Sequence, residues 1–457
     1  MTKNWPKTWH FTALSLALVA AFPLAAGAQS LDDLRKEQKA LKERMDALDK
    51  KLQDAEAAKA SSGGMTTQQQ QDFNRIAVKT EALEDNQEAM GFRGLKISGQ
   101  MDPAYIYNKA QNRSGFQFLN SVDDDGYNYD NSYFGMAMID FQKEMEGGTK
   151  WRLTLAPNRG VGAVFNSSIV HEASVSVPLT DLQTRLIAGQ LPDWSGYEYL
   201  QPTLNKLITH NLLFDFTLPT AYTGAGLELT RGKWVMKGVV ANMNASKQTA
   251  DQTTPVFAFR GDYARGEFSG FGLAGVAGKA ANLVNGGSAT SLFLFETDAW
   301  FTRGDWTIQG QVSYGKQKNA AITADPNTGE LRDASWYGLS TLGAYKFTPR
   351  FEGIARFDYL YNKKNGGGLL GYGSDGRNGI GPGYTDDGTG VWSQTDPETG
   401  ANRYALSLGL GFLFNPNTTF KFEYRYDRAS ENVFFNVKDG SYTKDNHLLG
   451  GSVVVSF

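Results

Sequence analysis

The sequence predicts an all-β chain that closes into an antiparallel barrel of about sixteen strands, preceded by an N-terminal α-helical coiled coil. Two observations predict the barrel. Residues after Arg93 alternate with a period of two, and very short connections alternate with longer polar or Gly-rich ones. A third observation predicts the coiled coil, because apolar residues between Leu31 and Ala55 recur every seven positions.

The composition fits a chain rich in strands and turns. The 457 residues include 51 glycines, and 12% of all residues are aromatic. A net charge of −3 argues against a nucleic-acid-binding surface, so we expect no nucleic-acid partner. The chain contains no cysteine, which excludes disulfides, thiolate metal ligands and a cysteine nucleophile.

Residues 1–28 have the features of a secretory signal peptide. Lys3 and Lys7 precede an apolar run, and Ala26 and Ala28 occupy the small-residue positions of a cleavage site. The run is shorter than the about 20 residues that a spanning helix needs, so an uncleaved anchor is the weaker alternative. No later stretch reaches about 18 consecutive apolar residues, and we expect no spanning helix in the mature chain.

Residues 29–60 are predicted to form the coiled coil. Its narrow stripe consists of Leu31, Leu34, Gln38, Leu41, Met45, Leu48 and Leu52. Because such a stripe needs a cover, we expect self-association; a single solvated helix with i,i+4 charge pairs is the alternative. Residues 61–72, with Gly63 and Gly64, are interpreted as a flexible linker, and residues 73–92 as a second short helical segment.

Residues 93–457 are predicted to form the barrel. In "FEGIARFDYLYN" (351–362) and "TFKFEYRYDR" (419–428) the aromatic residues occupy alternate positions, which places them on one side of a strand. The strands span roughly 9 to 15 residues, enough to cross a bilayer at a tilt and longer than most soluble strands. A soluble sandwich or propeller is the alternative. It is disfavoured because the short turns all fall at one end and no blade-length repeat is evident.

Alternation turns many charged side chains toward the inside of the predicted barrel. An Arg or Lys facing lipid at mid-depth would cost about 2–4 kcal/mol, so we expect these side chains to line a wet lumen. Some are expected to pair with one another and brace the wall. The predicted pore-lining residues are Arg152, Glu228, Lys237, Arg260, Glu296, Asp298, Glu352, Arg356, Asp358, Lys421, Glu423 and Arg425.

The final stretch "GGSVVVSF" is predicted to be the closing strand. Val453, Val455 and Phe457 alternate on one face of it. This pattern resembles the C-terminal strand of bacterial outer-membrane barrels, which typically finishes in Phe. The resemblance implies a Gram-negative outer membrane, contact with its lipid, and recognition of these three residues by the barrel assembly machinery.

A second resemblance covers residues 187–229, which are similar to a stretch of the OmpL-like putative β-barrel porins. Gly189 ends a strand, Gly196-Tyr197-Glu198 lies in an outer loop, and Thr223-Gly224 opens the next strand. A signal peptide, a heptad segment and then a barrel looks like trimeric porins with an N-terminal periplasmic coiled coil. The resemblance implies a homotrimeric outer-membrane porin that lets small hydrophilic solutes or ions diffuse through a charged lumen.

The long loop at 191–220 is unusually apolar for an outer loop. Within "LQPTLNKLITHNLLFDF" the apolar residues recur at helical spacing. The third loop of general porins folds into the lumen, so the resemblance implies a constriction with Lys206, His210 and Asp215 as its candidate residues. A subunit contact or a lid on the outer surface remains the alternative.

Catalytic and cofactor chemistry are not indicated. Alternation places His171 and His447 on the lipid side, and Ser452 on the face opposite to His447. The acidic stretch "SVDDDGYNYDN" misses the EF-hand spacing and is interpreted as a solvated loop rather than a calcium site. We expect no enzyme activity, cofactor or metal. The alternative to a channel is a structural protein that tethers the envelope, with a plugged barrel and a periplasmic coiled coil.

Overall fold

The computed structural model describes residues 39, 42, 46, 50, 71–72, 74–81, 94–119, 134–156, 169–248, 252–282, 288–321, 325, 327–362, 379–395 and 399–457. The chain divides into two compact units, Met1–Gly91 and Phe92–Phe457. In the first unit the described residues are helical, and they include residues 74–81 of the predicted second segment. The predicted signal peptide and the seven heptad residues lie outside the described residues. Among the described residues, no helix is long and apolar enough to cross a membrane.

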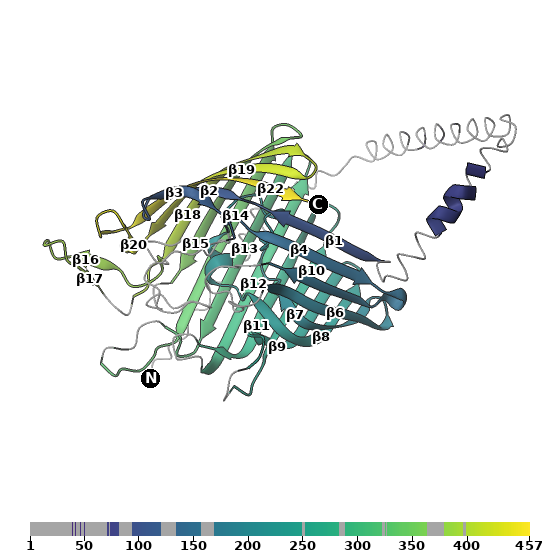
Figure 1. Ribbon diagram of the computed structural model, residues 1–457. Helices are drawn as coiled ribbons and strands as arrows, with labels where there is room; N and C mark the ends of the chain where they lie inside the picture. The colour runs from purple at the N-terminus through teal and green to yellow at the C-terminus, as the bar shows by residue number, and fades with distance from the viewer. Residues whose placement is uncertain are drawn as a thin grey trace. The chain divides into compact units, whose positions relative to one another are not determined.

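The second unit is a closed antiparallel barrel whose wall has 16 strands (Figure 1). Two wall strands are each divided into two segments, β1 with β2 and β3 with β4, which gives the 18 strands of the sheet. The segments are β1 (Leu95–Met101), β2 (Ala104–Asn108), β3 (Arg113–Gln117), β4 (Ala137–Glu144), β5 (Lys150–Leu155), β6 (Val170–Asp181), β7 (Thr184–Pro192), β8 (Ala221–Arg231), β9 (Trp234–Met243), β10 (Val256–Ala264), β11 (Ser269–Ala281), β12 (Ala289–Arg303), β13 (Trp306–Gln317), β14 (Ala334–Lys346), β15 (Phe351–Tyr361), β18 (Arg403–Asn415), β19 (Thr418–Ala429) and β22 (Asp445–Ser456).

The remaining elements lie outside the wall. Two small hairpins occur in the long loops, and two short helical elements occur between wall strands. They are the hairpins β16 (Tyr384–Asp386) with β17 (Trp392–Gln394) and β20 (Phe434–Phe435) with β21 (Tyr442–Thr443), the 3-10 turn η2 (Glu146–Gly148) and the helix α4 (Leu212–Phe216). The prediction of a barrel of about sixteen strands is therefore confirmed.

The first two wall strands differ from the expected pattern. The sequence predicts a long polar loop near residues 109–129, but the chain turns within Lys109–Asn112, where the Asn112 N–H donates to the Lys109 carbonyl at 3.0 Å. The long connection lies instead within the second wall strand, between β3, which ends at Gln117, and β4, which begins at Ala137. The two segments belong to one wall strand because β3 pairs with β2 and β4 pairs with β1. At its base the Leu119 N–H donates to the Gly135 carbonyl at 2.6 Å, so the chain returns to the place it left.

The last strand closes the barrel against the first. β22 pairs with β2 and with the end of β1 in one continuous register, and on its other side with β19. Phe457 and Gly99 exchange two backbone hydrogen bonds of 3.0 and 3.1 Å. A Cβ atom at Gly99 would lie 2.5 Å from the Phe457 ring, so this position needs glycine for the ring to cover the strand. Phe457 is therefore part of the seam of the wall.

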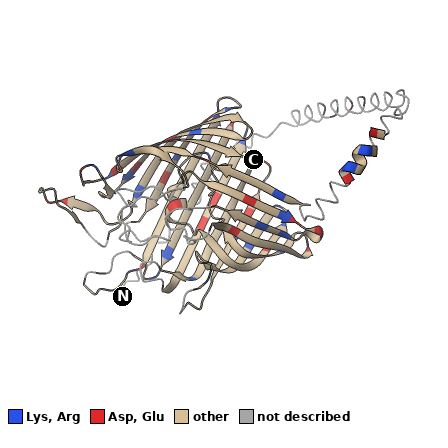
Figure 2. Ribbon diagram, in the orientation of Figure 1, with Lys and Arg blue, Asp and Glu red and all other residues tan. Residues whose placement is uncertain are grey.

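The two faces of the wall differ as the alternation predicts. On β19, Phe422 and Tyr424 are exposed on the outside, whereas Glu423 and Arg425 are buried on the inside. Figure 2 shows charged residues distributed along many strands of the wall. The outer face carries the apolar and aromatic side chains and the inner face carries the charged ones. This arrangement is typical of a membrane-spanning barrel and is the reverse of that in a soluble protein.

Candidate functional site

The loop between β7 and β8, residues 193–220, packs inside the barrel, and we call it the inner loop. Its helix α4 places Leu212, Leu213 and Phe216 in one buried cluster with wall residues of strands β7 to β12, β14, β15 and β18. Glycines of the wall make room for it. A Cβ at Gly338 would lie 2.2 Å from the Leu213 side chain. The apolar pattern of the loop is therefore satisfied inside the lumen, against the wall.

The Glu423 carboxylate on β19 binds the backbone of the inner loop. It accepts hydrogen bonds from the N–H groups of Ile208 (2.7 Å) and Thr209 (2.8 Å), and from the Thr209 hydroxyl (2.5 Å). Arg425, two residues along the same face, donates to the His210 carbonyl at 2.7 Å and to the Thr209 hydroxyl at 3.1 Å. On one strand, the carboxylate of Glu423 thus binds backbone N–H groups of the inner loop, and the guanidinium of Arg425 binds a backbone carbonyl.

Arg356 on β15 adds a third attachment. Its guanidinium pairs with Glu198 of the inner loop at 2.8 Å and with Asp358 of its own strand at 3.2 Å. It also donates to the carbonyls of Thr209 at 2.6 Å and His210 at 2.8 Å. Burial raises the pKa of the Glu198 carboxyl, and the charge of Arg356 opposes that shift. We call Glu198, Thr209, Arg356, Glu423 and Arg425 the clasp.

Two lysines extend the attachment of the inner loop. Lys421 donates to the carbonyls of Pro202 and Asn205, both at 2.6 Å, and the Lys206 ammonium lies 2.6 Å from a carboxylate oxygen of Glu352. Further along the loop, the Gly196 N–H donates to Glu296 at 2.7 Å. Charged side chains of β12, β15 and β19 therefore hold one face of the inner loop.

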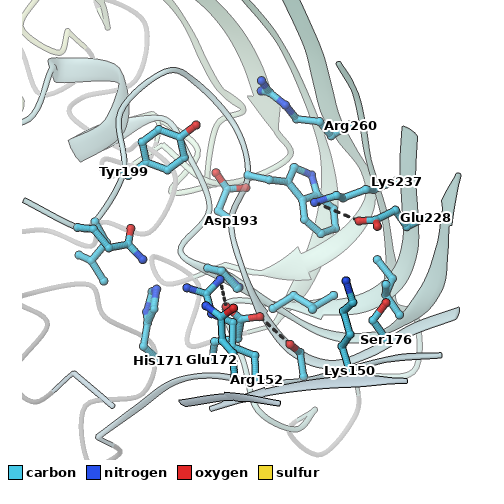
Figure 3. A pocket seen from close by; sticks show the side chains of 18 of the residues that line it. Lys150, Arg152, His171, Glu172, Ser176, Asp193, Tyr199, Glu228, Lys237 and Arg260 are labelled. Carbon is cyan, nitrogen blue, oxygen red and sulfur yellow. Dashed lines mark hydrogen bonds and ion pairs between the residues drawn. The ribbon is translucent and has the colours of Figure 1, made fainter. Parts of the chain in front are cut away.

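A cavity of about 940 Å³ remains on the opposite side of the lumen. It lies between the inner loop and the inner faces of the wall from β1 and β4 to β10, and Figure 3 shows part of its lining. A space of this size accommodates a small organic molecule. Its ionisable lining residues are Lys96, Lys143, Glu144, Lys150, Arg152, His171, Glu172, Arg185, Asp193, Glu198, Tyr199, Asp215, Glu228, Lys237, Arg260 and Asp262.

Charged residues of neighbouring strands form a row along this cavity. Glu228 and Lys237 lie opposite each other on β8 and β9 with 3.4 Å between their charged atoms, as Figure 3 shows. Arg260 lies opposite Lys237 on β10 and pairs with Asp262 at 2.7 Å and Asp298 at 2.6 Å. The row has both signs, and most of its members are paired.

Asp193 begins the inner loop at the edge of the cavity. Its carboxylate accepts hydrogen bonds from the Tyr222 hydroxyl at 2.7 Å and from the Ser195 N–H at 2.9 Å. Burial raises the pKa of Asp193 to about 6, although these donors and Arg260 act in the opposite direction. The charge of Asp193 is therefore sensitive to mild acid.

The structure corrects the predicted position of His171. The pairing of β5 with β6 shifts where Glu172 lies opposite Thr154 and Val170 lies opposite Leu155. His171 is the extra residue of this β-bulge, and a bulge re-aims a side chain. It is 4% exposed and lines the cavity, so the prediction that it faces lipid is wrong. Alternation along one strand cannot reveal the extra residue of a bulge, because a bulge is defined by the pairing of two strands.

The predicted lumen residues fall into two groups. Arg152, Glu228, Lys237 and Arg260 line the cavity. The others lie against the inner loop, its attachments or Arg260, and most of them are buried: Glu296, Asp298, Glu352, Arg356, Asp358, Lys421, Glu423 and Arg425. These side chains therefore meet the inner loop or one another rather than open space, because the inner loop covers the wall there.

The three predicted loop residues lie in different surroundings. Lys206 is paired with Glu352, and Asp215 lines the cavity from α4. The His210 ring is buried, stacks on Phe214 with 4.1 Å between ring centroids, and lies 2.8 Å from the Tyr199 carbonyl oxygen. Lys206 and His210 therefore hold the loop in place, and Asp215 alone of the three lies at the cavity.

Sequence reasoning missed several of the charged residues that the structure brings together. Arg403 and Asp427 form a fully buried pair at 2.7 Å on β18 and β19. Asp427 follows Arg425 by two, so the alternation used for that strand could have found it. Glu198 and Thr209 carry no such signal, since an irregular loop has no period.

The predicted assembly residues lie on the outer face of β22. Val455 and Phe457 are exposed there, in line with the outward side of the wall. His447 also faces outward, and its Nδ1 lies 2.8 Å from the Tyr424 hydroxyl. Among the described residues, no group of acidic residues and histidines could hold a metal ion. The acidic loop "SVDDDGYNYDN" lies outside the described residues.

One family model covers most of the chain. It is described as "Protein of unknown function (DUF3138)" and matches residues 64–457. The chain belongs to this family. The matched range extends through the whole barrel and includes the described helical residues 71–72 and 74–81. No curated protein matches the chain at a significant level.

Solved structures with a similar fold are outer-membrane proteins. OmpT of Vibrio cholerae has a TM-score of 0.49 at 10% identity, with 79% of this chain and 97% of that chain covered. The outer membrane channel DcaP of Acinetobacter baumannii gives 0.49 at 11%, with 79% and 97% covered. An anion-selective porin from Comamonas acidovorans gives 0.47 at 12%, with 79% and 99% covered.

Loss of Arg356 from the clasp should release the inner loop from the wall. Arg356→Ala is expected to lower the free energy of unfolding by about 3–5 kcal/mol, because buried carboxylates lose their partner. Trypsin should then cleave the folded protein after Lys206. Urea titration in detergent micelles measures the first effect, and limited proteolysis with mass spectrometry the second.

Arg231→Ala is the matched control for this variant. Arg231 lies 3.7 Å from Asp181, and both side chains are half exposed at the short-turn end of the barrel. Its loss should leave the urea midpoint nearly unchanged and Lys206 protected. Equal midpoints for the two variants would contradict the role of the clasp.

Proposed function

We propose that this protein is an outer-membrane porin through which small hydrophilic solutes or ions diffuse passively. The observation that carries the proposal is a closed barrel, apolar outside, that encloses a cavity of about 940 Å³ lined by charged side chains. A membrane-spanning sheet has no other stable place for so many charges. In this proposal the barrel lies in the outer membrane, the N-terminal helical segment lies in the periplasm, and no covalent chemistry is involved.

The solute path is proposed to follow the cavity side of the lumen. Arg152, Glu228, Lys237 and Arg260 would then contact passing solutes, since they line that space. The inner loop would narrow the path, because the clasp holds it across the lumen. Mixed charges at such a constriction tune which ions and polar solutes pass.

A second candidate function is a structural one. The same clasp fills part of the lumen with buried, paired charges, as expected for a plugged anchor. A coiled coil of about 29 residues would span about 43 Å at 1.5 Å per residue, enough to reach into the periplasm. In this alternative the barrel tethers the envelope and passes no solute.

Conductance of the purified protein in planar bilayers separates the two functions. A porin is expected to give stable ion steps in potassium chloride, because the cavity is wet and charged. The steps should grow when the inner loop is shortened by deletion of residues 199–209. Insertion of folded protein, checked by its heat-modifiable mobility on gels, without any ion steps would favour the tether.

We further propose that the heptad residues assemble the protein as a trimer. Apolar stripes of this kind are stable only against a partner helix. The triple variant Leu34→Asp, Leu41→Asp and Leu48→Asp is expected to dissociate the oligomer, as measured by native mass spectrometry in detergent. The variant Lys39→Asp with Lys50→Asp adds acidic charge away from the stripe and serves as control. Unchanged trimers in the triple variant would assign the assembly to another surface.

The last strand is proposed to act as the insertion signal. Deletion of Phe457 should leave the protein in the periplasm, as measured by cell fractionation. Gly99→Val is the control, because it disturbs the packing of the Phe457 ring on β1 and keeps the signal. This control should reach the membrane with a lowered unfolding temperature. A deletion variant that inserts at the wild-type level would exclude the signal.

A further inference from the structure

The cavity has an apolar surface on the side of the inner loop. Tyr199 is 51% exposed and Leu204 is 58% exposed, and both line the cavity together with Leu200, Phe214 and Leu218. Contact between water and these apolar side chains is unfavourable. Exposed apolar surface inside a polar cavity therefore marks a place where an organic group binds. Simple ions would need no such surface.

The wall below this surface carries cations. Lys96, Gln142 and Arg152 lie opposite one another on β1, β4 and β5, so they share one level of the inner wall. Lys150 precedes Arg152 by two and faces the same side, as Figure 3 shows. Lys96 is exposed and forms no ion pair with any described residue.

Most carboxylates at the cavity pair with a cation, whereas Lys96 and Arg185 form no ion pair with a described residue. The acidic residues that pair with a cation are Glu144 with Lys150, Glu172 with Arg152, Glu198 with Arg356, Glu228 with Lys237 and Asp262 with Arg260. Arg185, in contrast, donates to neutral oxygens, namely the Ser176 hydroxyl and the carbonyls of Ser176 and Gly148. A solute that brings a negative charge therefore meets Lys96 and Arg185 without competition from a bound carboxylate.

The two surfaces are close enough for one small molecule to touch both. The Thr203 hydroxyl donates to the Gln100 side chain at 2.5 Å, which places the tip of the inner loop beside β1. Lys96 lies four residues from Gln100 on the same inner face, a distance of about 13 Å along a strand. Leu200 packs against a buried cluster of Met136, Met138 and Ala156, and Met138 lies on the neighbouring strand β4. The apolar side chains of Tyr199, Leu200 and Leu204 thus lie near the same part of the wall as Lys96.

We propose that the cavity binds an organic anion with an apolar body. Its anionic group contacts Lys96, and its apolar part lies on Tyr199, Leu200 and Leu204. The inference rests on the proposed porin function and names the class of solute that the channel selects. It goes beyond ion selectivity, because charge and apolar surface must act together.

The experiment uses the full-length protein and a matched set of probes: hexanoate, acetate and hexylammonium. In planar bilayers hexanoate should reduce the potassium chloride current at a concentration at least about tenfold lower than acetate does, because it adds buried methylene groups. Hexylammonium should have no comparable effect. Equal potency of hexanoate and acetate, or of hexanoate and hexylammonium, would overturn the proposal.

Two variants and their controls locate the site. Lys96→Gln should weaken hexanoate block about tenfold through loss of a charge-assisted contact, and Leu204→Ser should weaken it about threefold to tenfold through loss of apolar area. Both side chains are exposed, so neither change removes a buried contact. Lys279→Gln repeats the first change and Val391→Ser replaces another apolar side chain by Ser, both at exposed positions away from the cavity lining, and they should leave the block unchanged. The same loss in these controls would overturn the location.

Equilibrium dialysis of labelled hexanoate against the protein in detergent makes the result independent of conductance. Comparison of wild type with Lys96→Gln removes the contribution of the micelles. Binding that depends on Lys96 in the absence of ion steps would refute the porin function and support the organic-anion site. Ion steps in the absence of such binding would support the porin function and refute the organic-anion site.

Discussion

The antiparallel pairing of β22 with β1 and β2 joins the end of the wall to its beginning. Without it, two strands would each present a row of unpaired N–H and C=O groups, which lipid cannot satisfy. The exchange of hydrogen bonds between Gly99 and Phe457 finishes this seam. Because the sheet is closed, every strand has one face toward the inside and one toward the outside. The burial of charge, the place of the inner loop and the cavity all follow from that division.

The inner loop shows how a barrel interior can hold charge without water. Arg356, Arg425 and Glu423 are almost completely buried, and their partners are the backbone and side chains of the loop. Burying ions costs several kcal/mol each, and pairing only offsets this when the remaining donors and acceptors are satisfied. Here the carboxylate takes backbone N–H groups and the guanidinium groups take carbonyls. Such an arrangement specifies one position of the loop, and the loop in turn confines open space to one side of the lumen.

Much of the wall could be predicted because strand alternation is a local property. The aromatic residues of β15 and β19 face outward as their spacing indicates. The insertion within the second wall strand was missed, since β3 and β4 become one strand only through their shared partner. His171 was misplaced for the same reason. A bulge and a strand interruption are defined by the neighbouring strand, and periodicity within one segment does not contain that information.

The amino-acid pattern determined the inward and outward faces of regular strands such as β15 and β19, and that the final Phe lies on the outer side of a strand. It also marked the loop at 191–220 as unusual, because an apolar stretch between two strands needs a cover. Which inward charges meet the loop and which meet open space was a matter of folding. Glu198 and Thr209 belong to the inner loop and Arg356 lies far along the chain on β15, so the clasp arises when the loop crosses the lumen. Contacts between a loop without a period and strands of a distant part of the chain are set by three-dimensional packing, which no local pattern encodes.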